Sequence, residues 1–217
     1  MVRARIAGIA GALLLFGGAV TVAVAAVSQQ HAPQPAAAAA GAVGPAAADA
    51  RGPSVRRSMP VSVDIPAIGV RSKLLHLGVN ADGTIQVPSL TTSADEAAWY
   101  KYSATPGQIG ASVIEGHVDS YQGPAVFFRL GALRPGDIID VTLADGITAI
   151  VRVTGVREYS KAKFPGRMIY GATDYAALRL ITCGGSFDPA TGHYLSSTVV
   201  FASLISARTP RHPGNAA

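Results

Sequence analysis

The sequence predicts an all-β domain, and three observations carry that prediction. Residues 61–65 alternate apolar and polar side chains with period two, as a half-buried strand does. A β-branched run over 137–143 reaches Asp145-Gly146 and resumes over 148–156, which is typical of a hairpin with a tight turn. Two further apolar, β-branched runs at 178–182 and 198–205 predict two more strands.

Helical periodicity is sparse along the same part of the chain. We expect only short helical turns at 95–102 and 125–130, with Phe127 and Phe128 in the core. The predicted domain covers residues 59–207, a length that is ample for a single hydrophobic core. Its many strands favour a barrel or a sandwich.

The chain before this domain begins like a membrane anchor. Arg3 and Arg5 form a basic end over residues 1–5, and residues 6–27 carry no charge. At about 1.5 Å per residue, a helix of that length would span about 33 Å, enough for a bilayer core. We expect a single-pass transmembrane signal-anchor with the basic end in the cytoplasm and the domain outside the cell. A cleaved signal peptide is the alternative, because Ala23-Val24-Ala25 resembles a small-residue cleavage site.

Residues 28–58 are rich in alanine, proline and glycine and contain almost no large apolar side chain. We expect a disordered tether with a reach of about 30 Å, because such a segment cannot bury enough surface to order itself. Residues 208–217 are expected to be a flexible tail. Much of the net charge of +5 lies in the tether and the termini, without interleaved aromatic residues. That distribution favours anionic lipid or cell-wall polymer as a partner and argues against nucleic acid.

Cys183 is the single cysteine and stands where an apolar, β-branched run meets Gly184-Gly185. It has no partner for a disulfide within the chain, so it is either a small buried hydrophobe or a reactive thiol. The glycines favour reactivity, because they let the backbone turn sharply and leave room for another chain to approach.

A cysteine nucleophile needs a base or a cation nearby, since the thiolate is the species that attacks. His117 is the candidate base, because it ends the strand-like run 111–116 and also has a small neighbour. The other histidines lie in tail-like sequence, in an apolar alternation or in a polar loop: His31, His212, His76 and His193.

These residues resemble the sortase family. The resemblance is collinear over residues 59–207 and rests on four strings: Gly116-His117-Val118-Asp119, Gly123-Pro124-Ala125-Val126-Phe127-Phe128, Gly136-Asp137 and Leu178-Arg179-Leu180-Ile181-Thr182-Cys183. The long insert 184–194 after the cysteine most resembles the actinobacterial group called class F. The resemblance implies an eight-stranded sortase-type β-barrel with short helical turns.

The resemblance also implies a chemistry and its partners. Cys183 would attack the backbone of an LPxTG-like C-terminal sorting signal on a secreted protein and hold the acyl group as a thioester, while His117 moves protons. An amine of a cell-wall peptide precursor would then resolve the thioester. Thr182 is expected to line the cleft, whereas Asp119 and Asp188 are expected to serve loop solvation and turn formation. No metal-ligand cluster is visible, and no cofactor is implied.

One position departs from the family pattern. Sortases place an arginine on the strand after the cysteine loop, where it can hydrogen-bond the substrate and the developing oxyanion. The aligned position is Leu195, and no arginine or lysine occurs between positions 180 and 207. Ser196 or Ser197 could donate instead, or an arginine from elsewhere in the chain. Arg179 lies about 13 Å from the cysteine along the strand, which is a poor reach.

Leu195 also leaves a second function open, a membrane-tethered pseudoenzyme that binds sorting signals without cutting them. Other enzymes with a cysteine and a histidine fit less well. An L,D-transpeptidase usually shows Ser-x-Gly-Cys, and a papain-like protease places its cysteine before its histidine, whereas His117 precedes Cys183 here.

Overall fold

The computed structural model describes residues 31–43 and 52–209. The strands are β1 (Pro60–Ile65), β2 (Val70–Leu77), β3 (Ala97–Tyr100), β4 (Gly110–Glu115), β5 (Asp119–Ser120), β6 (Gly123–Pro124), β7 (Ile138–Leu143), β8 (Thr148–Ser160), β9 (Ala176–Asp188) and β10 (His193–Arg208). The helical pieces are the 3-10 turns η1 (Ala37–Ala40), η3 (Pro66–Ile68), η4 (Leu130–Ala132) and η5 (Lys161–Lys163), and the short α-helix α1 (Gly166–Tyr170).

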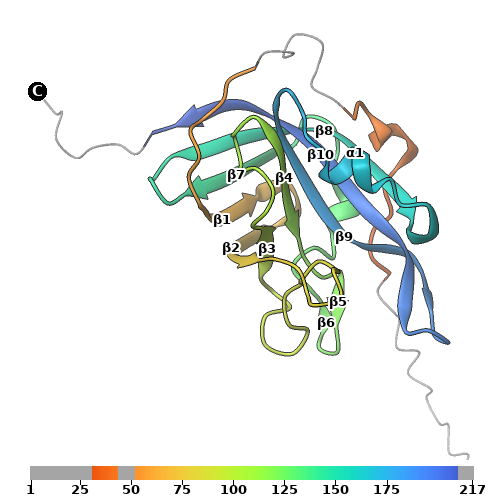
Figure 1. Ribbon diagram of the computed structural model, residues 1–217. Coiled ribbons are helices and arrows are strands. Elements are labelled where there is room, and N and C mark those ends of the chain that lie inside the picture. Colours follow the sequence, from red (N-terminus) through yellow and green to blue (C-terminus); the bar gives the residue numbers. More distant parts are fainter. Residues whose placement is uncertain (1–30, 44–51, 210–217) are drawn as a thin grey trace, which may run out of the picture.

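Eight strands close into a barrel in the order β1-β2-β3-β4-β9-β10-β8-β7, and β5 and β6 form a separate two-stranded sheet (Figure 1). The predicted all-β barrel is therefore confirmed. The basic end 1–5, the anchor expected at 6–27 and residues 210–217 of the expected tail lie outside the described residues. Within the described ranges, no helix is long and apolar enough to cross a membrane.

The predicted hairpin is present, but one predicted helical turn is wrong. β7 and β8 pair antiparallel around Asp145-Gly146. The segment expected to be a helical turn at 95–102 instead contains β3, which pairs parallel with β2 and antiparallel with β4. Trp99 is fully buried there. Two strand ladders and the burial of the strand outweigh a weak helical pattern in so short a segment.

The second predicted turn, at 125–130, leads into η4. Phe127 is fully buried in the barrel core, as expected. Phe128 is only partly buried and lines a surface cavity, so its expected place in the core is wrong.

The strands bury apolar side chains on two faces. Leu178 and Leu180 of β9 point into the barrel, while Ile181 belongs to a second cluster on the outside. We call this second set the outer cluster, and it comprises Val113, Ile169, Ile181, Val199 and Phe201, with Val43, Tyr100, Tyr159, Phe164 and Tyr170 packed against it. Because α1 and the residue after η5 contribute to it, the segment 161–170 covers the outer face of the barrel.

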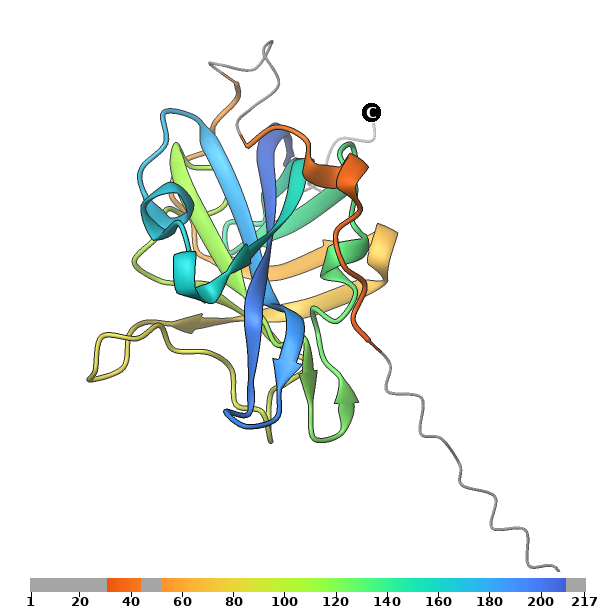
Figure 2. The ribbon, with the colours of Figure 1, turned by 90° about the vertical axis from the view of Figure 1, so that its right-hand side faces the viewer.

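Residues 31–43 form a strap that is packed against the barrel, which differs from the disordered tether expected over 28–58. Arg157 of β8 donates from Nε to the carbonyl of Ala40 at 3.0 Å and from Nη2 to that of Gly41 at 2.9 Å. The amide of Ala42 donates to Thr154 at 2.9 Å. Figure 2 shows the strap and α1 on different sides of the barrel.

The strap is held without large side chains of its own. Ala39 is 2% exposed and belongs to the barrel core. A Cβ atom on Gly131 would lie 2.0 Å from the carbonyl oxygen of Pro33, and one on Gly155 would lie 2.7 Å from that of Ala40. Glycine at these positions therefore allows a close backbone approach that composition alone did not predict.

Candidate active site

Cys183 lies within β9, two residues beyond the last pair of β9 with β4, and the strand continues to Asp188. The strand end expected at Gly184-Gly185 is therefore wrong, because β9 stays paired with β10 beyond the cysteine. The parallel register of β4 and β9 ends at Glu115 opposite Ile181, and the amide of Gly116 still donates to the carbonyl of Ile181 at 3.1 Å. The same register, extended by two residues, aligns His117 with Cys183. Both side chains are partly exposed. Two residues that the sequence singled out separately thus both lie two residues beyond the last pair of β4 with β9.

A backbone carbonyl orients the ring of His117. Its Nε2 lies 2.6 Å from the carbonyl oxygen of Pro88, in the connection between β2 and β3. A carbonyl oxygen only accepts hydrogen bonds, so Nε2 carries the proton and donates it. In the neutral ring Nδ1 is then the atom that can accept a proton. Among the described residues, no hydrogen bond joins His117 to Cys183.

The thiol of Cys183 has a different partner. Nζ of Lys161 lies 3.4 Å from Sγ, within hydrogen-bond distance for sulfur. Lys161 begins η5, immediately after β8. Sequence reasoning missed this residue, because it precedes the cysteine by 22 positions and no local motif marks it. The only signal in the sequence is a lysine at the end of a long strand.

Thr182, which is expected to line the cleft, has a buried side chain, and its role in the cleft stays a prediction. It is 5% exposed, and its position in the alternation of β9 places its side chain on the face of Leu180, opposite Cys183. Ser197 of β10 pairs directly with Cys183 but is also buried. Thr182 therefore belongs to the interior of the sheet.

Leu195 stands at an irregularity in β10. The pairing of β10 with β9 shifts register between Tyr194 and Ser196, and Leu195 is 52% exposed. Its neighbour Tyr194 donates a short hydrogen bond to the carboxylate of Asp119. Burial raises the pKa of Tyr194, and the hydrogen bond to Asp119 and the charges of Asp119 and Cys183 act in the same direction. The hydrogen bond to Asp119 therefore fixes the position of the Tyr194 side chain.

Asp188 caps the turn between β9 and β10, as expected of a turn residue. Its carboxylate accepts hydrogen bonds from the amide of Ala190 and the hydroxyl of Thr191, both at 2.9 Å. These bonds, the one from Ala190 first, lower the pKa of Asp188.

A tyrosine hydroxyl ties α1 to the end of β4. Tyr170 donates to Oε1 of Glu115 at 2.8 Å. Burial raises the pKa of Glu115, and the hydrogen bond from Tyr170 offsets part of that rise. Because Glu115 precedes Gly116-His117, this contact connects the cover of the outer cluster to the strand that carries the histidine.

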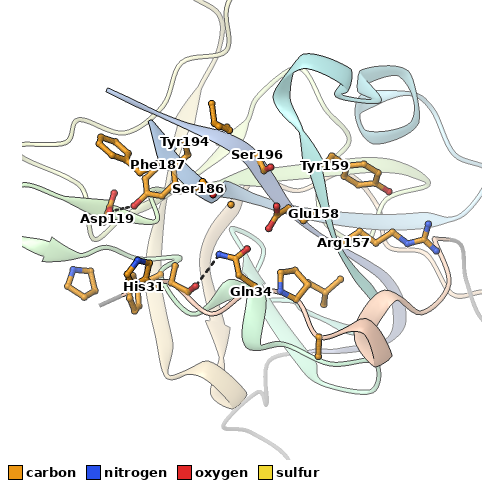
Figure 3. A pocket seen from close by; sticks show the side chains of 18 of the residues that line it. His31, Gln34, Asp119, Arg157, Glu158, Tyr159, Ser186, Phe187, Tyr194 and Ser196 are labelled. Carbon is orange, nitrogen blue, oxygen red and sulfur yellow. Dashed lines mark hydrogen bonds between the residues drawn. The ribbon is translucent and has the colours of Figure 1, made fainter. Parts of the chain in front are cut away.

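A cavity of about 1770 Å³ opens between the strap and the strand ends. Figure 3 shows Gln34 of the strap on one side and Glu158 and Ser196 of β8 and β10 on the other. Among its described lining residues neither Cys183 nor His117 is present, so we do not place the chemistry there. In the described part of the chain, no group of three histidine, cysteine, aspartate or glutamate residues could hold a metal ion.

Comparison with known proteins gives the class of this site. A model of the sortase domain matches residues 63–205. The chain therefore belongs to the sortase family of cysteine transpeptidases. A search of curated protein sequences finds no match.

Solved structures agree with this fold. Sortase A of Listeria monocytogenes is 15% identical with a TM-score of 0.53, over 72% of this chain and 92% of that one. Sortase C-1 of Actinomyces oris is 19% identical with a TM-score of 0.52, over 70% and 76% of the two chains. Sortase C1 of Streptococcus agalactiae is 19% identical with a TM-score of 0.51, over 67% of each. At these identities the likeness concerns the fold alone.

Proposed function

We propose that this protein is a membrane-anchored sortase that cleaves an LPxTG-like C-terminal sorting signal and transfers the protein to a cell-wall amine. The parallel pairing of β4 and β9 is the observation that supports this most directly, because it aligns His117 with the partly exposed Cys183 in a chain of the sortase family. A thiol nucleophile and an imidazole are the two groups that acyl transfer through a thioester requires.

The reaction has two acyl-transfer steps. The Cys183 thiolate attacks the carbonyl carbon of the threonine in the motif, and the C–N bond to glycine breaks while a C–S bond forms. The leaving amine takes a proton from His117. The acceptor amine then attacks the thioester carbon and gives a proton back to His117, and the C–S bond breaks to restore the thiolate.

Location and partners form the second part of the proposal. The uncharged segment 6–27 supports a single-pass anchor in the cell membrane, with the catalytic domain outside the cell. Secreted proteins with a sorting signal and a cell-wall peptide precursor would meet the enzyme at that outer surface. The insert 184–194 supports a class F subtype within the family.

The test is turnover of a synthetic LPxTG peptide by the full chain, with and without an added amine. We expect cleavage, formation of the amine-linked product, and an acyl adduct on Cys183 in intact mass spectra. Peptides with a scrambled motif serve as the control. Equal cleavage of the motif and scrambled peptides would overturn the proposed substrate class.

A sorting-signal-binding pseudoenzyme of low or no activity is the second candidate, and Leu195 at the position expected for arginine favours it. A neutral side chain there removes a charged donor that would stabilise the oxyanion. Saturable binding of the LPxTG peptide without adduct or cleavage, while the thiol still reacts with an alkylating agent, would support this candidate over the first.

A further inference from the structure

We infer that Lys161 is the cation of this active site: its ammonium group favours the thiolate of Cys183 and stabilises the oxyanion that forms on the substrate. The contact that carries this is the 3.4 Å separation of Nζ and Sγ. The role of Lys161 in stabilising the oxyanion rests on the proposed function. Its role beside the thiol of Cys183 rests on the structure alone.

The strand register explains why a lysine at this position reaches the site. Ser160 of β8 pairs with Ser196 of β10, and Tyr159 pairs with Ser197, which in turn pairs with Cys183. Tyr159, Ser197 and Cys183 thus form one row across three strands. Lys161 begins η5 two residues after Tyr159, and its Nζ reaches Sγ of Cys183.

The same register relates Lys161 to the missing arginine. Ser160 opposite Ser196 is the last pair of β8 and β10, and Lys161 and Leu195 are the next residues beyond it on the two segments. A long side chain from position 161 can therefore bring to the thiol a charge that position 195 lacks. The positive charge of the site thus comes from Lys161, directly after β8, and not from β10.

Two other polar side chains that could be considered for this role are engaged elsewhere. Arg179 is 2% exposed, and its guanidinium lies over the ring of Phe201 at 4.8 Å and donates to the carbonyl of Leu178 and the hydroxyl of Tyr175. The hydroxyl of Tyr194 donates to Asp119. Among the described residues, Lys161 is thus the cation with a recorded contact to Cys183.

The chemistry explains what this contact can contribute. A cation beside a cysteine favours the thiolate, which is the nucleophile. After attack, the negative charge moves to the carbonyl oxygen, and an ammonium group has three donors on a flexible stem that can follow it. A positive charge is the essential property, so arginine at position 161 should replace lysine better than methionine of similar length does.

The first experiment measures the thiol alone. The rate of alkylation of Cys183 by iodoacetamide at pH 7 is compared in the full chain for wild type, Lys161→Met, Lys161→Arg and Lys163→Met. Lys163 is a matched control, because it lies exposed on the same 3-10 turn. We expect about tenfold slower alkylation in Lys161→Met and rates within about twofold of wild type in the other two. Equal rates for Lys161→Met and Lys163→Met, in folded proteins, would overturn the inference.

The second experiment measures acyl transfer. We expect Lys161→Met to lower the acylation rate with an LPxTG peptide by about 10²-fold, since removing one oxyanion donor typically costs 10²- to 10³-fold. Adding Leu195→Arg to Lys161→Met should restore part of that rate, because both positions lie directly beyond the last pair of β8 and β10. No recovery would overturn the cross-strand relation, and an unchanged acylation rate in Lys161→Met would overturn the oxyanion role.

The two experiments separate this inference from the proposed function. If the wild type processes no sorting peptide while Lys161→Met still slows alkylation, the proposed function fails and the assignment of Lys161 to the thiol stands. Thermal unfolding of each variant tests whether loss of fold causes the slower reaction. The loss of stability is expected to be minor because Lys161 is exposed.

Discussion

The imidazole of His117 is oriented by the carbonyl of Pro88, which no substitution of the proline side chain removes. Nε2 is occupied in this arrangement, so proton transfer to or from the site uses Nδ1 unless the ring turns. The connection between β2 and β3 therefore influences catalysis through its backbone position.

Replacing Cys183 by alanine is predicted to abolish thioester formation and leave the fold intact. The side chain is only partly buried, so its loss leaves a small cavity at most. The measurement is the acyl adduct by intact mass spectrometry, with thermal unfolding as the check on folding. Peptide turnover at the wild-type rate by Cys183→Ala would show that the nucleophile is another group.

Leu195→Arg alone is predicted to change the acylation rate by less than about tenfold. Lys161 already contacts the thiol, so a second cation at position 195 adds little and repels the first. The rate with an LPxTG peptide is measured for Leu195→Arg and for a Leu195→Met control. A gain of about 100-fold in Leu195→Arg would mean that Lys161 does not perform this role.

At the residue scale, the apolar run over 111–116 indicated a strand that ends just before His117, and β4 ends at Glu115. The glycines after Cys183 did not mark a strand end, because β9 continues to Asp188. Lys161 could not be predicted, because its contact depends on the register of β8 with β10 and on the turn after β8.

At the scale of elements, the cover of the outer cluster and the histidine strand are joined by one polar contact. Glu115 ends β4, and Tyr170 ends α1. The carboxyl group is desolvated, so its charged form is disfavoured even with the hydroxyl as donor. The contribution of this contact to the stability of the fold therefore depends on pH.

Glu115→Gln is predicted to gain stability relative to wild type as pH rises. The pKa of Glu115 is higher in the folded than in the unfolded protein, so the folded state binds more protons between the two values. The favourable contribution of the group is present in full below its ordinary pKa near 4.5 and is lost as pH rises through the raised value. The difference in Tm between Glu115→Gln and wild type should be more positive at pH 8 than at pH 4.

Tyr170→Phe is the matched control for this pH dependence. It removes the donor and should be more destabilising at pH 8 than at pH 4, because the unpartnered carboxylate is then charged. A Tm difference for Glu115→Gln that is the same at pH 4 and pH 8 would contradict the assignment of a desolvated carboxyl group.

Among the elements, the hairpin of β7 and β8 was predictable because Asp145-Gly146 specifies its turn locally. β3 was not, because four residues carry too little pattern and its parallel pairing with β2 is a long-range contact. The same limit applies to the closure of the barrel by β1 and β7, which the alternation over 61–65 permits but does not specify.

At the scale of the whole molecule, the strap joins the barrel to the segment that precedes it. Composition predicted a disordered tether over 28–58, because alanine and glycine bury little apolar surface. The described residues 31–43 are ordered by hydrogen bonds that the guanidinium of Arg157 donates to their backbone carbonyls, and by close approach at glycines of the barrel. Those partners lie more than 80 residues away, so no local pattern reveals them.

The strap is predicted to stabilise the barrel without taking part in catalysis. Residues 31–217 should melt like the full chain, whereas residues 44–217 should melt about 2–8 °C lower, for a net loss of about 1–2 kcal/mol. Each hydrogen bond contributes about 0.5–1.5 kcal/mol, which the entropy of ordering the strap partly offsets, and about 1 kcal/mol shifts Tm by about 2–4 °C at this size. Peptide turnover at 25 °C should be similar in both, because Cys183 and His117 are not among the contacts of the strap.

Arg157→Met tests whether these contacts cause the difference. In residues 31–217 it removes both hydrogen bonds to the strap and should lower Tm, whereas in residues 44–217 the partners are already absent and the substitution should have little effect. An equal loss of Tm in the two backgrounds would mean that Arg157 stabilises the barrel itself. If residues 44–217 keep the Tm of the longer form and lose peptide turnover, the strap instead completes the substrate site, and the cavity between the strap and the strand ends becomes part of it.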